Sequence, residues 1–499
     1  MVRPASRRMV LAVVAFGVFV AADDLTVVAT TLRDIIGDLD IPLPDGLDDA
    51  AWIVNGYLVA YVAVMPLMGR LADIVGRRKT FVAALGLFAL GSAFLPHTTT
   101  LGWFTVGRVA TAVGGAAMIP VALAVTADLF EGRDRTRAIG LLGALDVLGW
   151  VWGPLFGALL VRFLDWRWQF HVNVPLALAG MVAAWWALAD VDAGRARRTM
   201  DLPGAALLST ALVLVTLGLL DSADISVAEE LGDLADGGGL PVLPMLIGAG
   251  IAFALFVAWE LRARDALIDL RVFGRRAYSG ALGTTFLVGA ALVIAMVDVP
   301  LFVNLVLETD LESAAVRSGM VLSALTLSMA VSTIGGGWAA ARFGARPVTV
   351  AGTLTSAVGF ALMAASWDTT VATPIMAVHL AVLGAGFGMV TAPLHDRAVS
   401  VVSADRRGVA GATVVLARLV GLTVGLSGLT AWAIHRYDTL RSAVTLPPLG
   451  DPGYADAASA AQASISADAL GATFAAAALV CLAASALAAA TLGRSHAAS

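Results

Sequence analysis

Charged side chains are scarce in this chain. Asp, Glu, Lys and Arg make up only 14% of its 499 residues, whereas 59% are hydrophobic and the mean hydropathy is +0.86. A soluble domain carries roughly a quarter charged residues, so the composition excludes a soluble globule. It predicts instead an all-α polytopic membrane protein.

Cysteine and nucleotide-binding motifs are also nearly missing. The single cysteine, Cys481, excludes an internal disulfide and a multi-thiolate metal site. The chain has no Gly-x-x-x-x-Gly-Lys-Ser/Thr loop for ATP and no histidine pair at metal-ligand spacing. We therefore expect no metal, no cofactor and no nucleic-acid partner, with a proton gradient as the natural energy source.

Long apolar runs are what the chain has in abundance. At about 20 residues per span, they predict fourteen membrane-spanning helices, near residues 9–31, 50–69, 80–97, 101–125, 137–163, 168–190, 203–220, 242–260, 278–307, 316–341, 347–366, 372–393, 407–435 and 468–493. The first run follows Arg7 and Arg8 and contains Asp23 and Asp24, which favours a first span over a cleaved leader.

The loops sort by charge. Arginine-rich loops (70–79, 133–137, 195–198, 262–276, 342–346 and 397–407) fall on one side, and acidic loops (38–49, 221–236 and 308–312) fall on the other. By the positive-inside rule, both termini are expected in the cytoplasm and the acidic loops on the outside.

A basic turn between the second and third spans organises the rest of the chain. Gly69 lets two helices approach, Gly76 permits a tight turn, and Arg77 and Arg78 hold that turn on the cytoplasmic side. With Asp73, these residues are predicted to form a cytoplasmic latch. The alternative is a short basic loop of any membrane protein.

A degenerate copy of this turn lies at residues 337–346, an offset of 268 (337 − 69), with Ala341 in place of Asp73. The chain therefore reads as two related halves. We expect an N-terminal six-helix bundle at 1–190, two inserted transmembrane helices with linkers at 191–276, and a C-terminal six-helix bundle at 277–499. Such repeats usually support alternating access.

Five charged residues inside predicted spans stand out: Asp24, Asp146, Asp298, Arg108 and Arg418. Each costs roughly 2.5 to 3.5 kcal/mol at a helix centre. We predict that Arg418 neutralises one or more of the acids in one conformation and releases them in another, so that protonation selects the state. Static ion pairs that join helices are the alternative.

The internal repeat relates these positions. Asp24 maps close to Asp298, and Asp146 maps close to Arg418. Both Asp146 and Arg418 are followed by glycines three and seven residues later, so equivalent sites carry opposite charges. Asp23 and His379 are secondary candidates for a proton path, with structural roles as the alternative.

The fifth span carries small residues every four positions and a proline that adds a bend: Gly149, Gly153, Pro154 and Gly157. A generic tight helix contact is the bland interpretation of this pattern. The alternative, a functional motif, depends on the family resemblance described next.

The turn at residues 69–79 resembles the loop signature of the major facilitator superfamily, Gly-x-Leu-Ala-Asp-x-x-Gly-Arg-Arg/Lys. The glycines of the fifth span resemble the superfamily's exporter signature, with Ala158 replacing its last glycine. The run 108–116 resembles the fourth-span motif implicated in proton transfer, with Thr111 in place of its Gln. The resemblance implies a major facilitator fold of two six-helix bundles plus two extra helices, and it points to efflux.

Residues 166–175 and 24–28 resemble the fourteen-span drug:proton antiporters. The stretches 52–67, 297–299 and 414–418 look closest to the mycobacterial triacylglyceride and drug exporters that work with a periplasmic lipoprotein. Those proteins carry a longer external insertion between spans eleven and twelve, where this chain has only 366–373. A lipoprotein partner is thus implied by the resemblance, but docking through that insertion is not.

The expected function is a proton-coupled exporter of hydrophobic or amphiphilic compounds, drugs or lipids such as triacylglycerides, acting as a monomer. It is not expected to be an enzyme. Two other classes stay open: a membrane-embedded lipid-handling enzyme, which needs a clustered nucleophile or metal set, and a non-transporting sensor with a transporter fold.

Overall fold

A computed structural model describes residues 6–39, 41, 47–191, 199–230, 242–308, 310–444, 447 and 453–493. The basic group 195–198, part of the acidic segment 221–236 and part of the loop 38–49 lie outside these ranges. The described chain is built from helices, and fourteen of them are long and apolar enough to cross a membrane. A spanning helix satisfies its own backbone hydrogen bonds, which a lipid environment demands.

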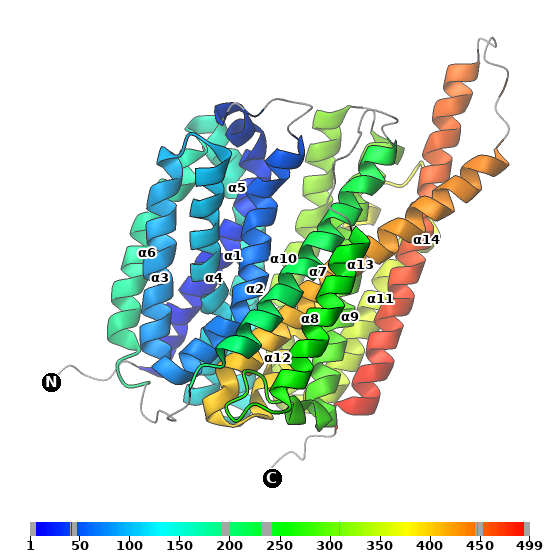
Figure 1. The fold of residues 1–499 in the computed structure, drawn as a ribbon. Helices are drawn as coiled ribbons and strands as arrows, with labels where there is room; N and C mark the ends of the chain where they lie inside the picture. The colour runs from blue at the N-terminus through cyan, green and yellow to red at the C-terminus, as the bar shows by residue number, and fades with distance from the viewer. Residues whose placement is uncertain are drawn as a thin grey trace.

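The long helices follow one another through the chain (Figure 1): α1 Arg7–Asp38, α2 Leu47–Val75, α3 Arg77–Phe94, α4 Leu101–Leu129, α5 Gly132–Phe163, α6 Arg167–Ala187, α7 Leu202–Glu230, α8 Val242–Glu260, α9 Arg276–Phe302, α10 Leu311–Phe343, α11 Ala345–Ser366, α12 Thr373–Ser400, α13 Arg407–Ala443 and α14 Tyr454–Thr491. Short helical turns connect some of them: η1 Leu95–His97, η2 Leu270–Gly274, η3 Val303–Leu307 and η4 Ala404–Arg406. The predicted all-α, fourteen-span fold is confirmed.

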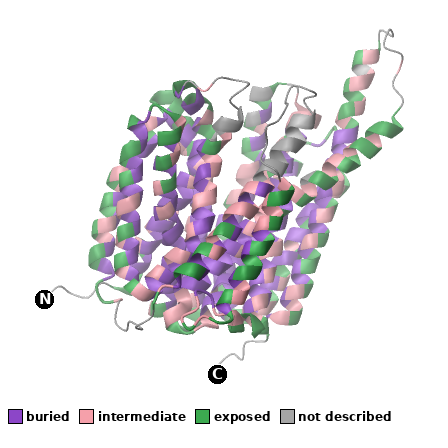
Figure 2. Ribbon diagram, in the orientation of Figure 1, coloured by how far each residue is buried: buried purple, intermediate pink, exposed green. Residues whose placement is uncertain are grey.

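Helices α1 to α6 pack together, and so do α9 to α14. The two groups meet along one seam, where α2 and α4 contact α13, and α5 contacts α10 and α12. Figure 2 shows buried residues gathered in the centre of the molecule and exposed residues on the outer helix faces. The division at residues 1–190, 191–276 and 277–499 stays a prediction.

The helix α7 crosses the seam on the outside. It packs against α2 and α13, while α8 packs against α7. The Ser209 hydroxyl donates to the carbonyl of Ala63 on α2 at 2.8 Å, and the Ser427 hydroxyl of α13 donates to the carbonyl of Leu219 at 3.1 Å. Helix α7 is therefore attached to both groups, and α8 is held through α7.

Glycines set the tightest helix contacts in both halves. A Cβ on Gly153 of α5 would meet the backbone of α1, at 2.8 Å from the Asp23 carbonyl oxygen. A Cβ on Gly425 of α13 would meet the backbone of α9, at 2.5 Å from the Cα of Ala290. The repeated glycine spacing thus corresponds to equivalent helix pairs, α1 with α5 and α9 with α13.

One end of the bundle carries the α2–α3 turn; we call it the basic end. Helix α1 begins there and α14 ends there (Figure 1). At the opposite end, α13 and α14, orange and red in Figure 1, extend beyond the other helices. The sequence predicted spans that end near 435 and start near 468, so it missed this helical projection.

Candidate functional site

The predicted latch joins the two groups of helices at the basic end. The Asp73 carboxylate accepts hydrogen bonds from Arg77 and from the backbone amides of Gly408 and Val409, both at 3.0 Å. These amides open α13, where the positive end of the helix dipole favours a negative charge. Asp73 therefore ties α2 to the first turn of a helix from the other half.

Two glycines make this contact geometrically feasible. A Cβ on Gly69 would lie 2.8 Å from the carbonyl carbon of Gly408, so a side chain there would push α13 away from α2. Gly76 adopts φ = 111°, a left-handed conformation that glycine tolerates best, and it turns the chain directly into α3.

Arg77 extends the junction. Its guanidinium donates to Asp128 at the end of α4 at 3.3 Å and to the Ala404 carbonyl at 2.9 Å. Arg78 lies elsewhere, over the Trp185 ring at 4.0 Å from the centroid. Of the two predicted latch arginines, the structure thus brings Arg77 to the seam.

Two ion pairs cross the seam in a related way. Arg407, at the start of α13, contacts Asp128 at 2.7 Å, and Arg135, at the start of α5, contacts Asp396 at the end of α12 at 2.6 Å. The two aspartates are related by the repeat offset of 268 (396 − 128). Sequence reasoning missed both pairs, although that offset applied to Asp128 leads to Asp396.

Inside the first half, the Asp24 carboxylate is completely buried. Arg108 of α4 donates to its Oδ2 at 2.9 Å and to its backbone carbonyl at 3.4 Å, and Asn173 of α6 donates to its Oδ1 at 3.2 Å. The neighbouring Asp23 accepts from Gln169 at 3.3 Å. The structure thus brings Asp24 and Arg108 together and gives each acid its own amide partner.

Asp146 and Arg418 form a second buried pair. The guanidinium of Arg418 on α13 donates to the Asp146 carboxylate on α5 at 3.0 Å, so this pair spans the seam. Arg418 also lies over the Trp150 ring, 5.4 Å from its centroid. The two positions that the internal repeat relates are therefore joined to each other by this ion pair across the seam.

Asp298 has different surroundings. It accepts a hydrogen bond from the Thr473 hydroxyl of α14 at 2.6 Å and is 4% exposed, next to the buried apolar residues of the second half. Among its described contacts there is no basic side chain. Asp298 is consequently a buried carboxyl group whose described hydrogen-bond partner is a neutral hydroxyl.

The secondary candidate His379 lies in the first turns of α12, where its Nδ1 accepts from the Trp367 indole at 3.3 Å. It is separate from the buried acids. Across the described ranges, no three His, Cys, Asp or Glu side chains gather as a metal site would need.

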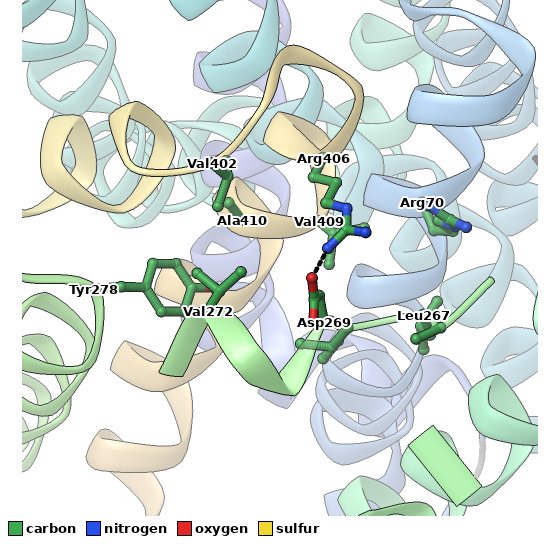
Figure 3. A pocket seen from close by; sticks show the side chains of 11 residues that line it. Arg70, Leu267, Asp269, Val272, Tyr278, Val402, Arg406, Val409 and Ala410 are labelled. Carbon is green, nitrogen blue, oxygen red and sulfur yellow. Dashed lines mark hydrogen bonds and ion pairs between the residues drawn. The ribbon is translucent and has the colours of Figure 1, made fainter. Parts of the chain in front are cut away.

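A small pocket opens at the basic end, between α2, the linker after α8 and the start of α13 (Figure 3). Asp269 of the linker pairs with Arg406, and Arg70 of α2 lies beside them. Burial by itself raises the pKa of Asp269, but hydrogen bonds from Arg406 and from the Arg271 amide hold it below the usual value. The arrangement fastens the linker to both halves.

The Major Facilitator Superfamily model matches residues 14–426. A protein named triacylglyceride transporter from Mycobacterium tuberculosis is 35% identical over 461 residues, covering 89% of this chain and 86% of that protein. A triacylglyceride transporter from Mycobacteroides abscessus is 36% identical over 436 residues, covering 84% and 81%.

Two solved structures share the fold. The human organic anion transporter MFSD10 superposes with a TM-score of 0.61 at 15% identity, covering 96% of this chain and 99% of that one. The proton:xylose symporter XylE superposes with a TM-score of 0.60 at 15% identity, covering 95% and 94%.

Proposed function

The chain belongs to the major facilitator superfamily, and from that premise we propose that it is a proton-coupled exporter of triacylglycerides and related hydrophobic or amphiphilic compounds. Relatives that match it over most of its length are named triacylglyceride transporters. The proposal concerns the energy source, the direction and the substrate, and it assigns a role to each buried charge.

The observation that carries the proposal is the pair of buried ion pairs, Asp24 with Arg108 and Asp146 with Arg418. A carboxylate beside a guanidinium ionises readily, whereas a carboxyl group that loses its cation in an apolar site takes up a proton. Because the Asp146 pair spans the seam, it cannot survive a large separation of the two halves. Protonation and seam opening are thus linked.

Asp298 completes the proposed set as a proton carrier without a cation. One charge moved across 100 mV corresponds to about 2.3 kcal/mol, and a tenfold concentration gradient to about 1.4 kcal/mol. A single proton per cycle can therefore sustain a useful export gradient.

Alternating access supplies the mechanism. Asp73, Arg77 and the crossing pairs hold the basic end closed while the opposite end releases substrate, and their rupture opens the basic end for loading. We assign the basic end, with both termini, to the cytoplasmic side of a bacterial inner membrane. The glycine contacts of α5 with α1 keep the first half rigid during this motion, which fits the proposed exporter role of the motif at Gly149, Gly153, Pro154 and Gly157.

The exported lipid needs an acceptor, because a triacylglyceride carries long apolar chains that water does not solvate. A periplasmic lipoprotein of the kind that the family resemblance implies would serve, with the transporter itself monomeric.

Reconstituted vesicles test the proposal. Purified protein in liposomes is given a triacylglyceride with one fluorescent acyl chain, and a pH gradient is imposed across the membrane. We expect gradient-driven movement of the lipid that a protonophore abolishes and that protein-free liposomes lack. Movement that is indifferent to the gradient would refute proton coupling, and absence of movement would refute the lipid substrate.

A further inference from the structure

Two tyrosines of α2 stack beside the buried charges. The rings of Tyr57 and Tyr61 lie 5.6 Å apart at an interplanar angle of 18°, and both side chains are buried. They occupy positions i and i+4 and therefore share one face of the helix. Both lie within residues 52–67, but the sequence predicted no role for either tyrosine.

The Tyr57 ring is a second partner of Arg108. The guanidinium lies over the ring at 4.1 Å from its centroid, while its NH1 donates to Asp24. A cation above an aromatic face is attracted by the negative face of the ring, most strongly where water is excluded. Protonation of Asp24 removes the anionic partner of Arg108, whereas the aromatic partner remains and then provides a larger share of the stabilisation of the guanidinium.

The Tyr57 hydroxyl is buried and has no hydrogen-bond partner among the described residues. A Cβ on Gly115 of α4 would come within 3.0 Å of this hydroxyl and within 3.5 Å of the Tyr61 ring. Gly115 therefore leaves the room that both rings occupy. Because the hydroxyl forms no hydrogen bond here, the contacts that Tyr57 makes are those of its ring.

Tyr61 supports the Tyr57 ring, because the two rings stack and the Tyr61 side chain is only 4% exposed. The polar and charged groups around Asp24 come from four helices: Asp23 on α1, Tyr57 on α2, Arg108 and Thr111 on α4, and Gln169 and Asn173 on α6.

We propose that Tyr57 is a positioning residue for proton coupling: its ring holds the Arg108 cation in place when Asp24 becomes protonated, with Tyr61 stacked behind it. The inference rests on the proposed proton-coupled function. Without the ring, protonation of Asp24 would leave the buried guanidinium with only the Asp24 backbone carbonyl, at 3.4 Å, so losing the ring destabilises the protonated state more than the ionised one. Protonation would then require a higher proton concentration.

The test is the pH profile of transport of the fluorescent triacylglyceride in reconstituted vesicles. Tyr57→Phe keeps the ring and is expected to keep the midpoint of the profile. Tyr57→Leu is expected to move the midpoint about one unit toward lower pH, since a desolvated cation–π contact and a tenfold change in proton affinity are of similar size. Tyr61→Leu should move it in the same direction by less.

A fluorination series separates this role from simple packing. Phenylalanines with progressively more ring fluorines at position 57 keep the ring's shape but weaken its negative face, so the midpoint should fall stepwise with fluorination. This series also decides the question if Tyr57→Leu fails to fold. A midpoint that stays constant along the series would overturn the inference, whereas a wild-type profile without any pH dependence would overturn the proposed function instead.

Discussion

Asp146 and Arg418 come from different halves of the chain and bury their charges against each other, at 4% and 8% exposure. Removing one member of a buried pair leaves the other charge without a counter-ion, whereas replacing both by apolar groups is often tolerated. Substitutions of this pair therefore test how much it contributes to holding the two halves together.

We expect Asp146→Asn to lower the stability of the state with a closed basic end by about 3 kcal/mol, because Arg418 stays buried and unpaired. The double variant Asp146→Leu with Arg418→Met should recover much of this loss. Thermal unfolding in detergent measures both. The exposed pair Arg137 with Asp134 provides the control, since Asp134→Asn should change stability by less than about 1 kcal/mol. Equal losses for Asp146→Asn and the double variant would contradict the account.

A substitution at Asp298 can distinguish an effect on protein stability from an effect on proton coupling. Asn at this position keeps the shape and can still accept the hydrogen bond from Thr473, so we expect Asp298→Asn to unfold within about 1 kcal/mol of the wild type. It cannot carry a proton, so gradient-driven transport should be lost. The exposed acid Asp368 gives the control variant Asp368→Asn, with transport unchanged. Full gradient-driven transport by Asp298→Asn would remove this residue from the coupling set.

The charged residues themselves could be predicted from the sequence, because a charge inside an apolar run is conspicuous. Their neutral partners could not. Thr473 and Asn173 are ordinary polar residues within apolar runs, and only the angles at which α14 meets α9 and α6 meets α1 bring them to the acids. Asp128 and Asp396 were missed for another reason: charges at helix ends are common, and only the repeat offset distinguishes these two.

At the scale of helices, close contacts at glycine decide the packing of α5 against α1. A Cβ on Gly153 would lie 2.8 Å from the Asp23 carbonyl and 2.9 Å from the Val27 amide, both rigid backbone atoms. A Cβ on Gly319 of α10 would meet nothing within 4 Å.

Gly153→Ala should therefore destabilise the protein by about 1 to 3 kcal/mol, because the two helices must separate. Gly319→Ala is the matched control and should be neutral or stabilising by up to about 1 kcal/mol, since Ala favours helix more than Gly does. Thermal unfolding of the two variants, prepared in parallel, makes the comparison. A Gly153→Ala variant as stable as Gly319→Ala would contradict the packing described here.

The linker between α8 and α9 contributes a prediction about pH. The pKa of Asp269 is lowered from 3.8, so the stability it contributes is present above its unfolded value and is lost only as pH falls through the lower folded value. Between about pH 5 and 8 this carboxylate keeps its charge. Asp269→Asn should therefore leave the midpoint of the transport pH profile unchanged. A shifted midpoint would place part of the pH response in the linker.

The apolar runs predicted the bounds of a helix only where the helix stops at the end of its apolar segment. The predicted spans near 407–435 and 468–493 stop where polarity rises, but α13 continues to Ala443 and α14 begins at Tyr454. The added part of α14 is rich in alanine and that of α13 in polar and charged residues. Such segments can form helix outside a lipid environment, so a hydropathy criterion ends the span too early.

For the molecule as a whole, the described contacts at the basic end hold the two halves together through symmetric pairs. Asp128 with Arg407 and Asp396 with Arg135 are related by the internal repeat, and both must break before the basic end can open. The repeat predicted two related halves. The repeat could not predict which end of the bundle is closed, because the same sequence adopts the state with a closed basic end and the state with an open one.

Asp396→Arg should bias the molecule toward an open basic end, and the exchange Asp396→Arg with Arg135→Asp should restore closure. The reporter is a cysteine at Ala392, a wholly buried seam position, in a Cys481→Ser background. Maleimide should label it faster in the single variant and return to the wild-type rate in the exchanged pair. Equal labelling in all three proteins would show that this pair does not hold the seam.

The central claim is that a proton bound at the buried acids drives lipid export, and Asp24→Asn tests it most directly. Vesicles with the wild type or the variant, at equal protein content, are loaded with the fluorescent triacylglyceride and followed with and without an imposed pH gradient. We predict that the wild type moves lipid against its gradient, and that the variant loses this uphill movement while still exchanging lipid across the membrane. Uphill transport by Asp24→Asn at the wild-type rate would contradict the account.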